Sequence, residues 1–162
     1  MIAVRSATVA DANRCAEIYA PFVTDSWVSF ALDAPDSEQM SGHIAGILQS
    51  HDWLVAEREG AVLGYVYGSE HRTRAAYQTS CDVAVYVDSA YKRQGIGRLL
   101  YEALLPRLKD RNIHAAFAGI ALPNQASIAL HQALGFDLVG TYREVGWKMG
   151  SWRDVTWFQR LL

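Results

Sequence analysis

One segment of the chain carries most of the information about its fold, Val85-Tyr86-Val87-Asp88-Ser89-Ala90-Tyr91-Lys92-Arg93-Gln94-Gly95-Ile96-Gly97-Arg98. Its apolar start is typical of a strand, and the basic turn with two glycines opens a helix expected over residues 95–111. Several backbone N–H groups of such a turn point to one spot at the positive end of the helix dipole. Glycine lets a phosphate come close to the backbone. The segment therefore predicts a diphosphate site, to which Arg93 and Arg98 can add positive charge.

The same glycines have other interpretations. A helix start that merely needs glycine is common. A nicotinamide site would have GxGxxG in an early βαβ unit, with an acidic residue about 20 positions further on. Here Gly-x-Gly comes late in the chain, and the Gly-Lys-Ser/Thr of a P-loop is absent. Both of these nucleotide sites are therefore disfavoured.

Around this segment the pattern predicts the element order β-α-α-β-β-β-α-β-α-β-β within one domain, residues 1–162. The expected elements are a strand at 1–6, a helix from Thr8 past Tyr19, a loop at 22–35, a helix capped by Asp36, a hairpin of 53–58 and 61–68, strands at 80–87 and 114–120, a helix from Asn124 to Leu134, and strands at 136–147 and 151–161. Gly135 is expected to stop the last helix in a left-handed conformation. Pro106 is expected to bend or interrupt the 95–111 helix, because proline removes a helical donor.

Composition excludes several classes of function. The chain has 162 residues, 51% of them hydrophobic, and a net charge of −2, which argues against nucleic acid or an anionic membrane as a partner. It has no apolar run of membrane-spanning length and no signal-peptide pattern, so we expect a cytoplasmic protein. Cys15 and Cys81 are expected to be buried, and the five histidines form no metal-binding motif.

Two motifs carry a resemblance to a known superfamily. The turn from Lys92 to Gly97 resembles motif A of the GNAT acetyltransferases, with Lys92 in place of the usual Gln or Arg. Downstream, Asn124-Gln125-Ala126-Ser127 and Leu134-Gly135-Phe136 resemble the next element of that superfamily. The resemblance implies the α/β acyl-CoA N-acyltransferase fold, a mostly antiparallel, splayed sheet with helices on both faces. It also implies acetyl-CoA as cosubstrate, bound in the splay between strands 80–87 and 114–120.

A narrower resemblance spans nearly the whole chain, from Ile2 to Leu161. The segments Ile120–Asn124, Gly140–Arg143, Gly146–Gly150 and Trp152–Asp154, with Gln159, are similar to phosphinothricin and methionine sulfoximine N-acetyltransferases. This implies direct acetyl transfer to the α-amine of a small amino-acid-like acceptor, without a metal, in a homodimer. Two alternatives stay open. One is a different amine acceptor (a polyamine, an aminoglycoside or a protein N-terminus), and the other is an acyl-CoA-binding domain without catalysis.

The resemblance also implies which residues contact the cofactor. The expected contacts are Val85, Tyr86, Val87, Arg93, Gln94, Gly95, Ile96, Gly97, Arg98, Asn124 and Ser127. The backbone of residues 85–87 is expected to pair with the pantetheine arm. Asn124 is equally well suited to cap the helix that follows it.

Two residues are candidates for catalysis. Asp82 stands where the family has a glutamate that serves as a base, and because it is one methylene shorter we expect a bridging water. Its alternative role is to hold a turn or an arginine. His131 matches the histidine of the phosphinothricin-type enzymes, and it could protonate the leaving thiolate or only hydrogen-bond in the cleft.

Residues for the acceptor are also implied. Arg74 and Tyr77 match a family Arg-x-x-Tyr, and an arginine can clamp a carboxylate through two parallel bonds. Arg72 is the alternative clamp, and either arginine could simply be solvated. Phe30 is expected in the substrate pocket or as a loop anchor. A final group, Tyr142, Trp147 and Trp152, is expected in the core or at a dimer contact.

Overall fold

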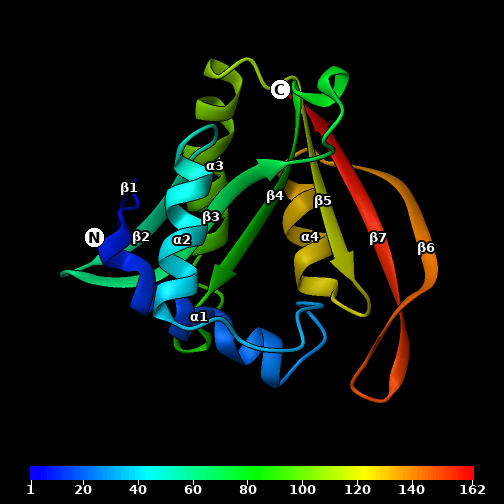
Figure 1. The fold of residues 1–162 in the computed structure, drawn as a ribbon, viewed down its shortest axis with the longest axis horizontal. Coiled ribbons are helices and arrows are strands. Elements are labelled where there is room, and N and C mark those ends of the chain that lie inside the picture. Colours follow the sequence, from blue (N-terminus) through cyan, green and yellow to red (C-terminus); the bar gives the residue numbers. More distant parts are fainter.

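The computed structural model describes all of residues 1–162 and contains a single seven-stranded sheet, in the order β1-β2-β3-β4-β5-β7-β6 (Figure 1). Every neighbouring pair is antiparallel except β4 and β5. The elements are β1 (Ala3–Ser6), α1 (Ala12–Thr24), α2 (Ser37–Leu48), β2 (Trp53–Arg58), β3 (Ala61–Glu70), β4 (Ser80–Val87), α3 (Ile96–Asp110), β5 (Ala115–Ala121), α4 (Gln125–Ala133), β6 (Asp137–Lys148) and β7 (Ser151–Leu161), with three short 3₁₀ turns. The expected element order is confirmed.

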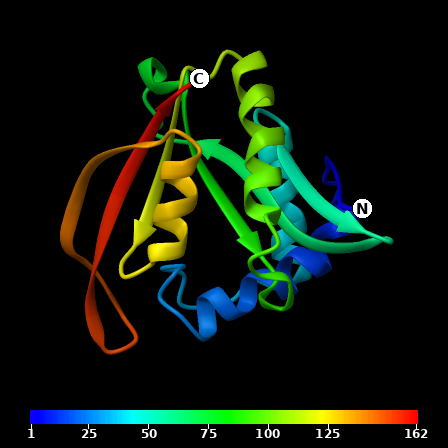
Figure 2. The ribbon, with the colours of Figure 1, turned by 180° about the vertical axis from the view of Figure 1, so that it is seen from behind.

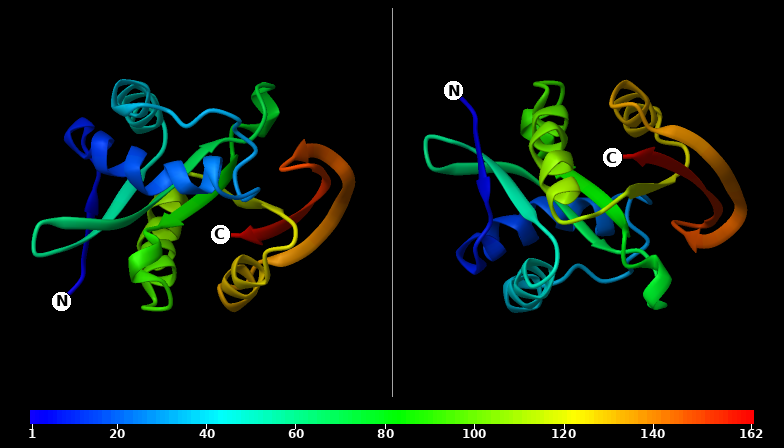
Figure 3. Two further views of the ribbon diagram at one scale, coloured as in Figure 1. Left: turned by 90° about the horizontal axis from the view of Figure 1, so that it is seen from below. Right: turned by 90° about the horizontal axis from the view of Figure 1, so that it is seen from above.

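Helices cover both faces of the sheet, as the views from below and above make plain (Figure 3). Helices α1 and α2 pack on one face around Trp53 and Tyr65, with Ile44 fully buried between them and the sheet. On the opposite face lie α3 and α4, where Leu100, Leu104 and Leu108 of α3 are fully buried (Figure 2). None of these helices combines the length and apolar character needed to cross a bilayer.

The alternation of β4 divides its side chains between these two faces. Val83 and Val85 belong to the core under α3. Tyr86 points the other way and contacts Tyr19 and Phe22 of α1, at ring-centroid distances of 4.9 and 5.2 Å. Asp82 and Ala84 share the face of Tyr86, because side chains two residues apart lie on the same side of a strand.

The sheet opens between its two parallel strands. Strand β4 pairs with β5 only from Ser80 to Asp82, opposite Ala115 to Phe117. Beyond this point the two strands diverge (Figure 1), while β5 stays paired with β7 as far as Ala121. The expected splay is therefore confirmed, and the rest of the edge of β4 that faces β5 has no strand partner.

Two prolines lie within helices, and one of these helices ends later than the sequence predicts. Pro106 does not interrupt α3, which runs from Ile96 to Asp110, and α1 continues through Pro21 to Thr24, where we expected a loop from residue 22. In each helix the carbonyl that loses its donor belongs to the residue four positions earlier. Those residues are Glu102 and Glu17, both exposed, so water can replace the missing bond.

Three aromatic residues of the last two strands lie outside the core. Tyr142, Trp147 and Trp152 are 54%, 58% and 58% exposed. The core alternative for this group is therefore wrong, because the long β6–β7 hairpin turns away from the helices and leaves its outer side uncovered. Elsewhere the expectations hold: Cys15 and Cys81 are fully buried, and Gly135 has a φ of 80°.

Candidate active site

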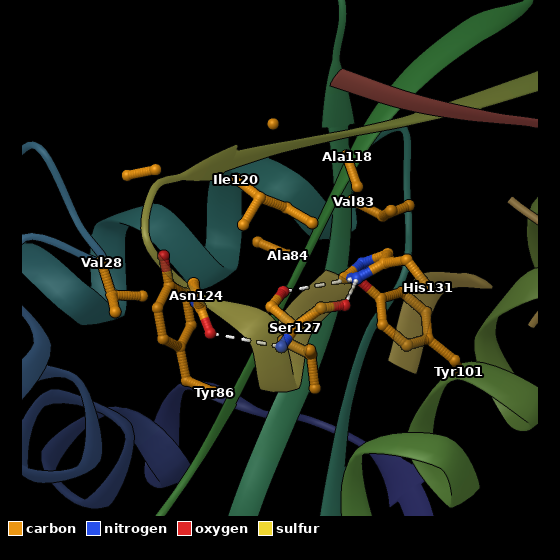
Figure 4. Close-up of a pocket in the computed structure, with 13 residues that line it drawn as sticks. Val28, Val83, Ala84, Tyr86, Tyr101, Ala118, Ile120, Asn124, Ser127 and His131 are labelled. Carbon is orange, nitrogen blue, oxygen red and sulfur yellow. Dashed lines mark hydrogen bonds between the residues drawn. The ribbon is translucent and has the colours of Figure 1, made fainter. Parts of the chain in front are cut away.

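A cavity lies in the splay between β4 and β5 (Figure 4). It is lined by both strands, by α4 with its N-cap, by one residue of α3 and by one residue of the α1–α2 loop (residues 25–36). The lining residues are Val28, Val83, Ala84, Val85, Tyr86, Tyr101, Ala118, Gly119, Ile120, Ala121, Asn124, Ser127 and His131. Four expected cofactor residues are among them: Val85, Tyr86, Asn124 and Ser127.

The glycine turn has the geometry that an anion site needs. Gly95 adopts a left-handed φ of 75° at the start of α3, and a Cβ added there would meet no atom within 4 Å. Open space therefore lies in front of the first, unpaired N–H groups of α3, which suits a phosphate. Gly97 is also required for packing, because its Cβ position lies 3.2 Å from Leu130 of α4. The Arg98 guanidinium is bound to Glu102 at 2.7 Å, so its charge is already partly balanced.

Asn124 is the N-cap of α4, since its Oδ1 accepts a hydrogen bond from the Ser127 N–H at 3.2 Å. The capping interpretation is thus confirmed, and the same cap holds both residues at the wall of the splay cavity. One turn further along α4, His131 lies beside Tyr101 in the wall of the cavity (Figure 4).

The hydrogen bonds of His131 fix its tautomer. Its Nδ1 lies 2.7 Å from the Ser127 carbonyl, which can only accept, so Nδ1 carries the proton. Nε2 then accepts from the Tyr101 hydroxyl at 2.9 Å. Burial lowers the pKa of His131, which keeps the ring neutral. The only N–H of the ring is therefore occupied, and the structure favours the hydrogen-bonding role over proton donation to a thiolate.

A second, open groove lies on the α1–α2 side of β4. It is lined by Val28, Ser29, Phe30, Tyr67, Ser69, Asp82, Val83, Ala84, Tyr86, Gly119, Ala121, Tyr142, Val145, Val155 and Trp157. Six of these residues also line the splay cavity: Val28, Val83, Ala84, Tyr86, Gly119 and Ala121. The two spaces therefore meet at the opening between β4 and β5, with Asp82 and Phe30 on the groove side.

Asp82 has a partner that the sequence did not indicate. Its Oδ1 lies 2.6 Å from Nδ1 of His71, at the end of β3. Burial raises the pKa of Asp82, and the His71 contact and the Arg72 charge oppose that rise. No motif joins residues 71 and 82, so only the antiparallel pairing of β3 with β4 reveals the contact.

The three loop residues expected to bind the acceptor are not in the groove wall. Arg72, Arg74 and Tyr77 are exposed in the segment between β3 and β4. Arg72 donates to the His71 carbonyl at 2.8 Å, and Tyr77 lies edge-on to the His71 ring at 5.9 Å. Arg74 forms no ion pair within the chain, so its guanidinium is free for an external carboxylate.

The α1–α2 loop is fastened to distant parts of the chain. Trp27 donates from Nε1 to the Pro123 carbonyl at 3.0 Å, and the Arg153 guanidinium lies 4.3 Å from its ring centroid. Lys148, 6% exposed, donates from Nζ to the carbonyls of Ser29 and Ala31 at 2.5 and 2.9 Å. Because these bonds join residues more than 90 positions apart, no local sequence pattern predicts them. They fix the backbone on either side of Phe30 over the groove.

The two cysteines and the residues that could bind a metal are further candidates for functional groups of the site. Burial raises the pKa of both Cys15 and Cys81 to about 12, so neither is a thiolate at neutral pH. No group of three or more His, Cys, Asp or Glu residues is arranged to hold a metal ion.

Comparison with known proteins agrees with this geometry. The model of the Acetyltransferase (GNAT) family matches residues 13–136. The chain belongs to the GNAT acetyltransferase family. Among curated members, it is 34% identical over 98% of its length to phosphinothricin N-acetyltransferase of Streptomyces viridochromogenes, covering 87% of that protein. It is 31% identical over 96% of its length to the L-methionine sulfoximine/L-methionine sulfone acetyltransferase of Salmonella typhimurium, covering 92% of it.

Solved structures of GNAT acetyltransferases share the whole fold. A phosphinothricin acetyltransferase from Sinorhizobium meliloti, crystallised with acetyl-CoA, superposes with a TM-score of 0.95 at 32% identity, over 99% of this chain and 88% of that one. A ribosomal-protein-alanine N-acetyltransferase from Brucella melitensis superposes with a TM-score of 0.96 at 35% identity, over 99% of both chains. The GNAT fold of this enzyme is therefore established, and its relatives have acceptors of different kinds.

The bonding of His131 leads to a first prediction. His131→Phe leaves the buried Tyr101 hydroxyl and the Ser127 carbonyl without their partner, so we expect unfolding free energy to fall by about 1–3 kcal/mol. The folded fraction should keep most of its kcat. Urea denaturation and steady-state kinetics would measure both, and a stable variant with a kcat loss of about 10²-fold or more would indicate proton donation instead.

Lys148 leads to a second prediction. Lys148→Met keeps the length of the side chain but removes both bonds to the α1–α2 loop. We expect kcat/KM for the acceptor to fall by about 10–100-fold, since a displacement near 1 Å can cost that much, with little change in KM for acetyl-CoA. Lys109→Met, on the exposed end of α3, is the matched control. Equal kinetics in the two variants would show that the Lys148 bonds to the α1–α2 loop do not affect acceptor binding.

Proposed function

We propose that this enzyme transfers an acetyl group from acetyl-CoA to the α-amine of a small amino-acid-like acceptor. The observation that carries the proposal is the shared wall of the splay cavity and the groove, with the Asp82 carboxylate on the groove side of the opening. A donor held in the splay and an amine held in the groove would meet there. Direct attack, with no acyl-enzyme, agrees with the two buried, protonated cysteines.

The chain offers suitable groups for the two ends of acetyl-CoA, which supplies the acetyl group as a thioester. The unpaired edge of β4 beyond Asp82 presents backbone N–H and C=O groups to the splay, where the amides of a pantetheine arm can pair with them. The Gly95 turn offers space and unpaired N–H groups to a diphosphate. Residues 85–87, 93–98, Asn124 and Ser127 stay our assignment for this cosubstrate.

Asp82 is our candidate for the group that takes the proton from the acceptor ammonium. An α-amine is mostly protonated at neutral pH and must lose a proton before it can attack. Asp82 lines the groove with a side chain that is 29% exposed, so a water molecule can reach it. A carboxylate at this position can therefore act directly or through one water.

The acceptor class rests on the free arginines before β4. Arg74 has no carboxylate partner in the chain, and Arg72 uses one N–H for a backbone carbonyl, so each can hold the α-carboxylate of an amino acid. Phosphinothricin and methionine sulfoximine or sulfone are our first candidates, in line with the curated relatives. A protein N-terminus is the second candidate, because the Brucella relative is a ribosomal-protein-alanine N-acetyltransferase.

We further propose that the enzyme works as a cytoplasmic homodimer. The β6–β7 hairpin exposes eight large hydrophobic side chains, which is typical of a surface that binds another protein: Leu138, Val139, Tyr142, Val145, Trp147, Met149, Trp152 and Leu161. Tyr142 and Val145 also line the acceptor groove, so a partner seated on the hairpin would lie close to the acceptor. Two free cysteines are usual in the reducing cytoplasm.

Asp82→Asn tests the base. The amide keeps the size of the side chain but cannot take up a proton, so we expect kcat/KM to fall by about 10²–10⁴-fold at neutral pH, with acetyl-CoA affinity unchanged. The loss should shrink at high pH, where the free amine needs no base. In the wild type the rate should fall as pH drops through the raised pKa of Asp82. A folded Asp82→Asn enzyme with normal activity at neutral pH would contradict the assignment.

Arg74→Ala tests the acceptor class. If the guanidinium holds the substrate carboxylate, KM for free methionine sulfone should rise by up to about 5-fold, because an ion pair at an exposed side chain contributes about 0.2–1 kcal/mol. An amidated substrate, which lacks the carboxylate, should be unaffected. Steady-state kinetics with Arg72→Ala beside it would identify the clamp. A preference for free acids that survives in both variants would exclude a carboxylate clamp at these residues.

A further inference from the structure

His71 lies at the apex of the splay. Asp82 and Phe117 form the last paired positions of β4 and β5, and the His71 ring covers both of them. It stacks on Phe117 with ring centroids 4.5 Å apart and planes 16° apart, and its Nδ1 is 2.6 Å from Asp82 Oδ1. The imidazole therefore sits at the point where the two strands part.

Packing against neighbouring aromatic side chains fixes the orientation of the His71 ring in the absence of substrate. Trp157 of β7 and Tyr77 meet it edge-on, with ring centroids at 6.3 and 5.9 Å, and its side chain is only 13% exposed. Packing on three sides leaves the ring little freedom to rotate. A hydrogen bond from a fixed ring can in turn fix the carboxylate that receives it, as in other sites where a second residue orients the reacting group.

Asp82 needs such a partner more than a glutamate would. With one methylene less than the family glutamate, it has a shorter reach into the groove, so its orientation matters more. The charged and titratable groups around the pair are few: Arg72 favours the carboxylate, the Tyr67 and Tyr77 phenols lie nearby, and β5 and β7 contribute only Phe117 and Trp157. His71 is thus the one neighbour that bonds directly to Asp82.

We infer that His71 is a positioning residue for catalysis: through its Nδ1–H it aims the Asp82 carboxylate at the acceptor amine and keeps it ionised. The inference rests on the proposed role of Asp82 as the base. Its chemistry is simple, because His71 exchanges no proton with substrate. Burial alone would push Asp82 towards its protonated form, and a hydrogen bond donated to the charged form opposes that.

Two substitutions at His71 separate positioning from packing. His71→Phe keeps an aromatic ring on Phe117 but removes the donor, while His71→Asn provides an amide N–H close to the position of Nδ1. For His71→Phe we expect kcat/KM for methionine sulfone to fall about 10–100-fold, the effect found for orienting residues of this kind. The acid limb of its pH–rate profile should move to higher pH, because Asp82 loses a bond that favours its charged form. His71→Asn should recover most of both effects.

His114→Phe, an exposed histidine before β5, is the control for the substitution itself, and calorimetry with acetyl-CoA should give the same affinity for all four proteins. A folded His71→Phe enzyme with the wild-type rate and pH profile would overturn the inference about His71. If Asp82→Asn is inactive in the same assay, the proposed role of Asp82 as the base still stands. Equal losses in His71→Phe and His71→Asn overturn it too, since the amide should restore positioning. If Asp82→Asn is fully active, the proposed base itself fails.

Discussion

The short parallel pairing of β4 with β5 is the constraint on which the rest of the structure depends. Three residues on each strand form the only parallel contact of the sheet, and the strands then diverge. Continued pairing would satisfy the edge of β4 and close the cavity. Because pairing stops at Asp82, one edge of β4 keeps free backbone groups, and the same position carries a carboxylate. A single break in the ladder thus creates both a binding edge and the place for the chemistry.

The remaining elements hold this opening in a fixed shape. Helix α3 packs on β3 and β4 on one side, and the Asn124 cap directs α4 along the other wall. On the acceptor side, Lys148 and Arg153 at the β6–β7 turn bind the α1–α2 loop, so the end of the chain supports a loop near its beginning. Burying the Lys148 ammonium costs desolvation free energy, which its bonds to two carbonyls offset in part. Because these carbonyls flank Phe30, the same bonds fix the shape of the groove.

Local signals in the sequence predicted the local structure well. The Glu59-Gly60 hairpin, the left-handed Gly135 and the Asn124 cap all depend on residues close together in the chain, and all are present. Pro106 does not interrupt α3 as we thought possible, because water can reach the carbonyl of the exposed Glu102. The His71–Asp82 pair, the Tyr101–His131 bond and the Lys148 contacts depend on which strands and helices become neighbours, which spacing along the chain does not encode. The family motifs led to Asp82 and His131, but not to the partners that set their protonation.

A crystal structure with CoA and N-acetylated methionine sulfone would test the central claim most directly. We expect the CoA thiol between β4 and β5, with its pantetheine amides paired with the free edge of β4. The acetylated nitrogen should lie within reach of Asp82, directly or through one water. The His71–Asp82 contact should persist in that complex. A thiol outside the splay, or an acetylated nitrogen on the α3 side of β4 and remote from Asp82, would contradict it.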